Sequence, residues 1–322
     1  MSAQESSEGF PHGGNASRLR LLETAITVTP GTPKRMVLDT DTFNEVDDQY
    51  ALVHVVLAPD LVRLEAVYAA PFHNGRSEGP GDGMEKSYEE IGRILDLLQA
   101  KSIPALRGAT EWLSESHNPV ATAAVNDLIE RARNSNNHPL YVVAIGAPTN
   151  IAVALLLAPD IIENIVVVWL GGHALNWPHA REFNLRQDLR ASQILFNSGV
   201  ALVHIPCLGV ADRLITTREE IERHVRPAGP IGAFLADRYA DYVDAAPGTS
   251  KVIWDLAATG WVMNSSWAST VLASSPVLTN DMTWSSDSGR HFIDEVVAVD
   301  RDAIYADLFA RLGRRAASTG GA

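Results

Sequence analysis

The stretch RMVLDTDTFNEVDDQYALVHVV, residues 35–56, consists of an apolar run, a polar loop and a second apolar run. The first run is short and aliphatic, which predicts a buried strand. The second run is followed by Ala-Pro-Asp, where proline disfavours further helix, so we expect a helix that begins at Asp47. Four aspartates, Asp39, Asp41, Asp47 and Asp48, therefore converge on one strand-to-helix turn.

The alternation of strand and helix continues along the chain. The segment VVLAPDLVRLEAVYAA, residues 55–70, recurs in outline as LLLAPDIIENIVVVWLGG, residues 155–172. Strands that alternate with helices favour right-handed crossovers and a mostly parallel central sheet flanked by helices on both faces. We therefore expect a single α/β domain whose ligands bind beyond the carboxyl ends of the strands. Further strands are expected at 140–145 and 201–206, helices at 84–100, 120–133 and 216–245, and a last strand and helix at 294–313.

The composition and net charge of the chain exclude some classes of binding partner. The chain has 26 Lys and Arg against 39 Asp and Glu, a net charge of −13, which disfavours nucleic acid and anionic membranes. A single cysteine excludes an internal disulfide. The first twenty residues lack the apolar core of a signal peptide and no run reaches the length of a membrane span, so we expect no export. We expect a cytoplasmic protein with its domain at residues 34–313 and flexible tails, rich in Gly, Ser and Ala, at 1–33 and 314–322.

Carboxylates crowded at one turn repel one another, so such a cluster persists most readily when a cation neutralises it or when some groups bind protons. Oxygen ligands alone indicate a hard cation, Ca²⁺ or Mg²⁺. An EF-hand is excluded because its loop would need Gly and Glu where this chain has Asn44 and Tyr50. A structural alternative remains open, in which Asp47 caps the helix and Asp39 binds loop amides.

The aspartate motif resembles the first motif of the inosine-uridine-preferring nucleoside hydrolases, in which a strand ends in D-x-D-x-G-x-D-D. Three later segments are also similar to family segments: AIGAPTNIAVAL at 144–155, NWPHAREFNLRQD at 176–188 and WDLAA at 254–258. These segments occur in the same order as in the family, between about residues 34 and 310. The resemblance therefore covers nearly the whole chain.

The resemblance implies Ca²⁺-dependent hydrolysis of the N-glycosidic bond of ribonucleosides, by a domain with a Rossmann-like core that forms a homodimer or homotetramer. It implies that Asp41, Asp48, Asp255 and the carbonyl of Ile145 hold Ca²⁺. Asp41 would also accept a proton from the attacking water. The implied sugar-binding residues are Asp47, Asn74, Asn176, Glu182 and Asn184.

Two features depart from the family pattern. Five residues, 42–46, separate Asp41 from Asp47, where the family usually has three, and the usual glycine is absent. Within this longer loop, Glu45 either faces solvent or reaches the site. Trp254 stands where some members have a His proposed to protonate the leaving base; it either stacks on the base or packs in the core. His117 is a further candidate to replace a missing family histidine.

Two other functions remain open. The pattern MVLDTDTF also fits the haloacid dehalogenase-like phosphatases, with Asp39 as nucleophile and Asp41 as acid and base on Mg²⁺. That mechanism needs a later lysine, and Lys86, Lys101 and Lys251 stand in no supporting context. The other function is a Ca²⁺-dependent nucleoside or ribose-binding protein that has lost turnover through its altered base pocket.

Overall fold

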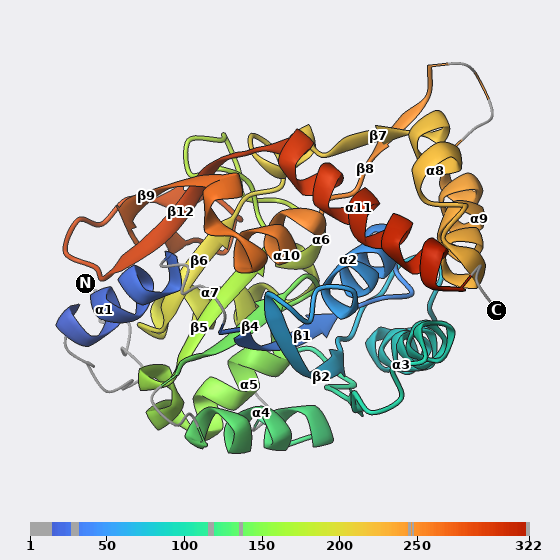
Figure 1. Ribbon diagram of the computed structural model, residues 1–322. Helices are drawn as coiled ribbons and strands as arrows, with labels where there is room; N and C mark the ends of the chain where they lie inside the picture. Colours follow the sequence, from blue (N-terminus) through green and yellow to red (C-terminus); the bar gives the residue numbers. More distant parts are fainter. Residues whose placement is uncertain are drawn as a thin grey trace.

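The computed structural model of the protein describes residues 15–26, 32–114, 119–134, 138–243, 246 and 248–319. Its centre is an eight-stranded sheet with the order β3-β2-β1-β4-β5-β6-β12-β9 (Figure 1). Neighbouring strands are parallel except β12 and β9, which are antiparallel. The strands of this sheet are β1 (Lys34–Thr40), β2 (Val62–Ala69), β3 (Ala105–Arg107), β4 (Leu140–Ala144), β5 (Ile165–Leu170), β6 (Ala201–Ile205), β9 (Ala268–Ser274) and β12 (Phe292–Val299).

Helices cover both faces of this sheet, and Figure 1 shows α4 and α5 on the side opposite to α2, α10 and α11. Two short antiparallel ribbons, β7 (Ile215–Thr217) with β8 (Ser250–Val252) and β10 (Val277–Leu278) with β11 (Trp284–Ser285), accompany the sheet. The α-helices are α1 (Asn15–Ile26), α2 (Asp47–Val56), α3 (Pro80–Leu98), α4 (Ala123–Arg133), α5 (Thr149–Leu157), α6 (Phe183–Gln187), α7 (Leu189–Asn197), α8 (Arg218–His224), α9 (Gly229–Tyr242), α10 (Leu256–Met263) and α11 (Arg301–Thr319).

The side chains of β1 show why the sheet is buried on both faces. Met36 and Leu38 pack into the core that contains α2 and α10, whereas Val37 packs into the core that contains α4 and α5. A strand that buries both faces reads as a continuous apolar run, and this was the signal in the sequence. The expected mostly parallel α/β fold is confirmed.

The predicted elements are present, but the structure has strands that were not predicted, among them β8, β9, β10 and β11. The three-residue strand β3 was not predicted, because it is too short to show a pattern and only half-buried. Residues 216–245 were expected to be helical throughout, but they begin in β7 and then form two helices, α8 and α9. Gly229 separates these helices with a φ of +75°, a left-handed conformation that glycine adopts without strain.

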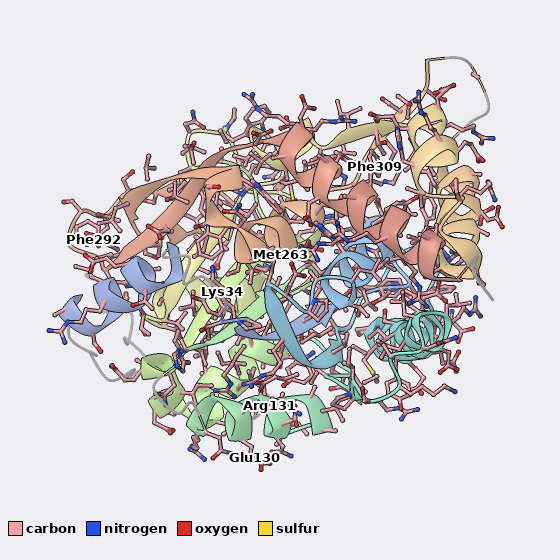
Figure 2. The ribbon with its side chains drawn as sticks, in the orientation of Figure 1. Lys34, Glu130, Arg131, Met263, Phe292 and Phe309 are labelled. Atoms are coloured by element: carbon pink, nitrogen blue, oxygen red, sulfur yellow. The ribbon has the colours of Figure 1, made fainter. Side chains whose placement is uncertain are left out.

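The helix α1 corrects the expected N-terminal tail. Residues 15–26, placed in a flexible segment by their composition, form a helix whose Leu22 and Ala25 are buried. Lys34 of β1, labelled in Figure 2, donates from Nζ to the Ala25 carbonyl at 3.1 Å. The boundary at residue 34 is therefore wrong for this helix. At the other end, α11 continues past residue 313 to Thr319.

The strand order places a topological switch between β1 and β4. From β1 the chain moves outward through β2 and β3, and it then returns to β4 on the other side of β1. Loops that leave two such strands diverge and open a crevice at their carboxyl ends. Asp41 follows β1 and Ile145 follows β4, so both lie at this crevice.

Candidate active site

The first motif forms the turn that the sequence predicted. β1 ends at Thr40 and α2 begins at Asp47, with Val46 as N-cap and no side-chain cap. The Thr40 hydroxyl donates to Asp48 Oδ1 at 2.5 Å. Asp47 is thus in the first helical turn without being the cap, which contradicts that part of the structural alternative.

Asp39 lies behind the site rather than in it. Its Oδ2 accepts a hydrogen bond of 2.7 Å from Asn150 Nδ2, on α5. Asn150 also accepts from the Ala109 amide at 2.7 Å, so it ties β1 to the loop after β3. Burial raises the pKa of Asp39 to about 7, against the lowering effect of the Asn150 hydrogen bond. Asp39 therefore stabilises the end of β1, whereas Asp41 faces the cavity.

A cavity of about 450 Å³ opens at the carboxyl ends of β1, β4 and β5, and it holds most of the expected site. Eight expected residues line it: Asp41, Asp47, Asp48, Ile145, Glu182, Asn184, Trp254 and Asp255. Its remaining lining residues are Asn44, Glu45, Leu170, His173, Arg181, Phe183, Arg186, Cys207 and Leu208. Residues more than two hundred positions apart in the chain thus meet in one cavity.

The aspartates in the cavity are buried, and three of their oxygens have no hydrogen-bond partner among the described residues. Oxygens of Asp47, Asp48 and Asp255 lie within 4.8 Å of one another. Each pair of full charges at such a separation repels by about 3 kcal/mol at an effective dielectric of about 20. Both oxygens of Asp41 and Oδ1 of Asp47 have no hydrogen-bond partner among the described residues. These carboxylate oxygens would therefore be stabilised by a bound cation or by hydrogen-bond donors.

The pKa values of these aspartates rise for the same reason. Burial raises the pKa of Asp41 well above its usual range, and the charges of Asp48 and Asp47 raise it further. Burial and the three neighbouring aspartates do the same to the pKa of Asp255. The pKa of Asp48 rises to about 7, because burial outweighs the hydrogen bond from Thr40. Without a counter-charge, the cluster would hold protons near neutral pH.

The donor set fits a hard divalent cation. Orphaned carboxylate oxygens and a nearby backbone carbonyl are ligands that such ions prefer. The converging group contains Asp47 in addition to the expected Asp48 and Asp255. Asp41, also expected as a ligand, is close enough for the charges of Asp48 and Asp47 to raise its pKa. The Ile145 carbonyl already accepts from Asn184 Nδ2 at 3.1 Å, and its second lone pair remains for another partner.

The Glu182 segment is held firmly at the ends of β4 and β5. Glu182 is the N-cap of α6, and its carboxylate accepts from the amides of Asn184 at 2.9 Å, Leu185 at 3.1 Å and Gly172 at 2.8 Å. Asn184 Nδ2 also donates to the Leu170 carbonyl at 3.0 Å. These bonds fix both side chains at the cavity wall.

Two expected sugar-binding residues do not line the cavity. Asn176 is exposed on the loop after β5. Asn74 lies one residue behind the wall, where its Nδ2 donates to Asn44 Oδ1 at 2.6 Å. His117 lies outside the described residues.

The longer loop at 42–46 is built into the cavity wall. Glu45 reaches the site and forms an ion pair of 2.6 Å with Lys251 of β8, which settles its orientation. The Asn44 carbonyl accepts from the hydroxyl of Tyr242 at 3.1 Å. The extra residues thus connect β1 to the α9 and β8 region, and they bring one cation close to the aspartates.

Trp254 packs against the core, as one of the two alternatives expected, and it also borders the cavity, so stacking on a base stays a prediction. Its side chain is partly buried against the hydrophobic core and also lines the cavity, directly before Asp255. An indole at the wall can stack on a planar base while its other face packs against the protein. It cannot donate a proton as a general acid does.

Several lining residues were missed from the sequence, among them His173, Arg181, Arg186 and Cys207. His173 follows the end of β5, so the rule that ligands bind at strand ends was a usable signal for it. Arg181 and Arg186 flank the Glu-Phe-Asn motif and were passed over as ordinary loop residues. Cys207 is buried beside Glu182, and burial raises the pKa of its thiol, which makes it unreactive.

The fold and the cavity together define an α/β protein with an acidic ligand site at the carboxyl edge of a parallel sheet. The sequence model of the inosine-uridine preferring nucleoside hydrolases matches residues 36–306, and the chain belongs to that family. This match confirms the expected family and replaces the phosphatase alternative.

Individual relatives agree with this assignment. A pyrimidine-specific ribonucleoside hydrolase, RihA, from Salmonella paratyphi A is 26% identical over 216 residues, which cover 59% of this chain and 66% of that protein. The chain thus matches slightly less than two thirds of that relative's length. RihA from Shewanella baltica is 29% identical over 229 residues, covering 63% of this chain and 68% of that protein.

Solved structures show the shared fold. A purine-preferring ribonucleoside hydrolase from Gardnerella vaginalis superposes with a TM-score of 0.71 at 21% identity, over 88% of this chain and 99% of the other. A plant nucleoside hydrolase, PpNRh1, gives 0.70 at 18% identity, over 87% and 99%. Among the described residues, none of the helices is long and apolar enough to cross a membrane.

Proposed function

We propose that this protein hydrolyses the N-glycosidic bond of ribonucleosides, or of a related N-riboside, to give ribose and a free base. The observation that carries the proposal is one cavity in which buried, unpartnered aspartates face Glu182 and Asn184. Family membership supports the same reaction. The acidic surface supports a small neutral or locally charged substrate rather than nucleic acid or a membrane.

We propose Ca²⁺ as the cofactor, held by Asp48, Asp255 and the Ile145 carbonyl, with Asp41 and Asp47 beside it. The hard oxygen donors and the excess of negative charge support a divalent cation of this type. Such a cation, when bound, makes a coordinated water more acidic and binds sugar hydroxyls. The choice of Ca²⁺ over Mg²⁺ follows the family resemblance.

The residues of the chain then have separate tasks. Asp41, with both oxygens free of other partners, accepts the proton of the attacking water. Water attacks the anomeric carbon through an oxocarbenium-like transition state, while Asp47, Glu182 and Asn184 hold the sugar. Glu182 is already fixed by three backbone amides, so it needs little reorganisation when the sugar binds.

Departure of the base relies on other groups. Trp254 offers a ring on which the base stacks. His173 lines the cavity, and its Nδ1 accepts from the Leu208 amide at 3.3 Å. This bond favours the tautomer with hydrogen on Nε2, which can donate to a base nitrogen. Burial lowers the pKa of His173, so it acts as a neutral donor at pH 7.

The reaction is tested with purified protein and a panel of purine and pyrimidine nucleosides in the presence of Ca²⁺, by measuring released reducing sugar. Release of ribose that disappears in Asp41→Asn supports the proposal. Binding of Ca²⁺ and nucleoside without cleavage would establish the binding protein instead, a function that the absence of a histidine before Asp255 favours.

We also propose a homodimer or homotetramer in the cytoplasm. Exposed apolar side chains on β9 and β12 support self-association: Val271 is 48%, Leu272 51% and Phe292 37% exposed (Figure 2 labels Phe292). Such side chains gathered on adjacent strands favour burial against another chain. Sedimentation velocity would show a single species of two or four chains, and a monomer at micromolar concentration would contradict the proposal.

A further inference from the structure

One wall of the cavity is basic, although the chain as a whole is acidic. The cavity is lined by three basic side chains that lie within fourteen residues of sequence: His173, Arg181 and Arg186. The ring of His179 lies 5.4 Å from that of His173 and extends the same wall. The chain carries 26 Lys and Arg against 39 Asp and Glu, so this concentration runs against its composition. We call these four residues the basic wall.

The two arginines of the basic wall have no carboxylate partner among the described residues. Arg181 donates from Nη2 only to the Asp281 carbonyl, at 3.3 Å. The guanidinium of Arg186 lies 5.4 Å from the ring centre of Phe183. The carboxylate between them in sequence, Glu182, is occupied by backbone amides. Arginines elsewhere, such as Arg35 and Arg311, hold carboxylates within 3 Å.

The basic wall also has a defined place relative to the sugar-binding residues. Arg181 directly precedes Glu182, and Arg186 lies one helical turn after it on α6. Both side chains are exposed at the cavity mouth, whereas the aspartates are buried inside. A ligand whose sugar binds Glu182 and Asn184 would therefore share its cavity with two exposed arginines.

We infer that the natural substrate is an N-riboside that carries an oxyanion group, which the basic wall binds. This inference rests on the proposed function of the same site. Guanidinium groups bind phosphate and carboxylate oxygens in pairs of hydrogen bonds, and a neutral nucleoside would leave both arginines without such a partner. The group is either a phosphate on the sugar or a carboxylate on the base.

The test compares kcat/KM for uridine and inosine with that for their 5′-monophosphates, and for uridine with orotidine, which carries a carboxylate on the base. In the wild-type protein we expect the anionic member of at least one pair to be preferred. In the double variant Arg181→Gln, Arg186→Gln, the ratio of anionic to neutral kcat/KM should fall about 100-fold, at roughly tenfold for each lost guanidinium. The pair that responds identifies where the oxyanion is.

The matched control is Arg223→Gln, which removes an exposed arginine of α8 outside the cavity. It should leave the ratio unchanged. Added salt should lower the wild-type ratio, because the arginines are exposed and screened. A wild-type preference for both neutral nucleosides over all anionic ones, or a ratio that the double variant does not change, overturns the inference.

Failure of the proposed reaction can be separated from failure of this inference. If no N-riboside is cleaved, calorimetric titration with uridine 5′-monophosphate and with orotidine, in the presence of Ca²⁺, still measures the basic wall. Binding that weakens at least tenfold in the double variant and not in Arg223→Gln supports the inference. The inference is overturned if neither compound binds, or if the double variant binds them as tightly as the wild type does.

Discussion

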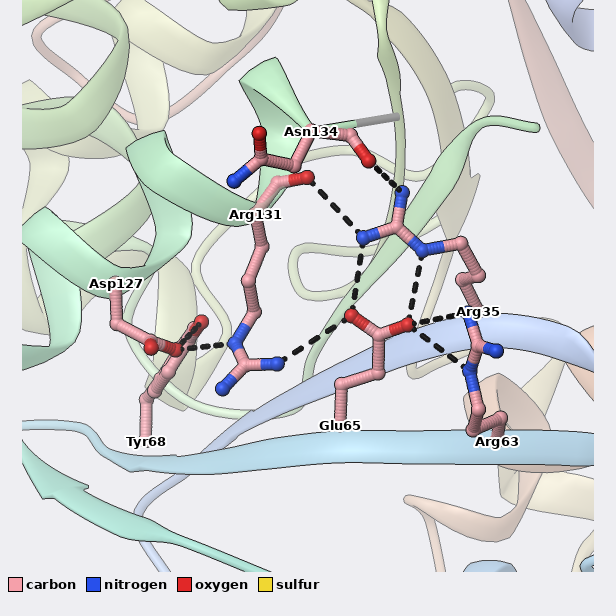
Figure 3. Close-up of polar contacts among 7 residues, drawn as sticks. All are labelled: Arg35, Arg63, Glu65, Tyr68, Asp127, Arg131 and Asn134. Atoms are coloured by element: carbon pink, nitrogen blue, oxygen red, sulfur yellow. Dashed lines mark hydrogen bonds and ion pairs between the residues drawn. The ribbon is translucent and has the colours of Figure 1, made fainter. Parts of the chain in front are cut away.

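One polar cluster lies on β1 and β2 and a second follows the end of β1, and they differ in how their charges are balanced. Around Arg35 and Glu65, Figure 3 shows a closed network in which Arg35, Arg63 and Arg131 all bind Glu65. Arg131 also binds Asp127 at 2.6 Å, and the hydroxyl of Tyr68 donates to the same carboxylate. Every carboxylate of this network has a cationic partner.

The cluster that follows β1 has no such closure. Its aspartates repel one another, and the nearest cation, Lys251, forms its ion pair with Glu45. The pKa values move in opposite directions: burial raises the pKa of Asp41, whereas hydrogen bonds and charge from Arg35 outweigh burial and lower that of Glu65. A cluster whose charges are balanced by its own ion pairs stabilises the fold, whereas a cluster whose charges are not balanced is suited to bind a ligand.

The largest effect is expected from Asp41→Asn. Loss of the proton acceptor should reduce kcat by about 10³-fold. Thermal stability should stay equal or rise, because one repelling charge is removed. Steady-state kinetics with a cleaved nucleoside, together with a melting curve, checks both. A variant that keeps more than a tenth of the wild-type kcat would show that Asp41 is not the base.

Removal of the divalent cation should have the next largest effect. Calcium at about 100 times its Kd stabilises the folded state by about 2.7 kcal/mol, so chelation should lower the Tm by roughly 5 °C or more. Asp255→Asn should remove most of this response. Differential scanning calorimetry with and without chelator measures it, and an unchanged Tm in the wild-type protein would count against a bound cation.

Glu65→Gln tests the other cluster. It weakens hydrogen bonds from three arginines, but the site is partly exposed, so we expect a loss of about 1–2 kcal/mol in the free energy of unfolding. The kcat/KM should not change, since the network is outside the cavity. Glu89→Gln, on the exposed side of α3, is the matched control and should change neither quantity. A loss of activity in Glu65→Gln would contradict the assignment of this cluster to the fold alone.

A smaller net effect is expected from pH, because the two clusters respond with opposite sign. The folded-state pKa of Asp48 is raised to about 7, so its contribution is fully present below about pH 4 and is lost as pH rises toward 7. Glu65 has a lowered pKa, and its contribution is lost as pH falls. Melting curves of the chelated protein from pH 4 to 8 should therefore show a decline in Tm that is smaller in Asp48→Asn, while the raised pKa values of Asp41, Asp47 and Asp255 maintain the rest. A decline that is equally steep in this variant would contradict the assignment.

The sequence predicted the part of this contrast that depends on local pattern. The apolar run of β1 followed by aspartates was enough to place the turn, and the resemblance to the family implied that Glu182, Asn184 and Asp255 join it. Asn74 and Asn176 do not line the cavity, so their expected contact with the sugar stays a prediction. The sequence did not predict the Glu45–Lys251 ion pair, which joins residues about two hundred positions apart.

The basic wall is a second feature that the sequence alone did not predict. Arg181 and Arg186 are ordinary residues in the sequence, and only the position of α6 at the cavity mouth makes them neighbours of the ligand. The network of Arg35 was likewise invisible, since its members come from β1, β2 and α4. Side chains that meet across elements depend on packing, which no single segment encodes.

We propose that the aspartates after β1 form a cation site, whereas the paired carboxylate of Glu65 on β2 does not. Isothermal titration of the chelated protein with Ca²⁺ distinguishes the two. We predict one ion per chain in the wild type and in Glu65→Gln, with at least a hundredfold weaker binding in Asp48→Asn. Absence of binding in the wild type, or equal binding in Asp48→Asn, would contradict the claim.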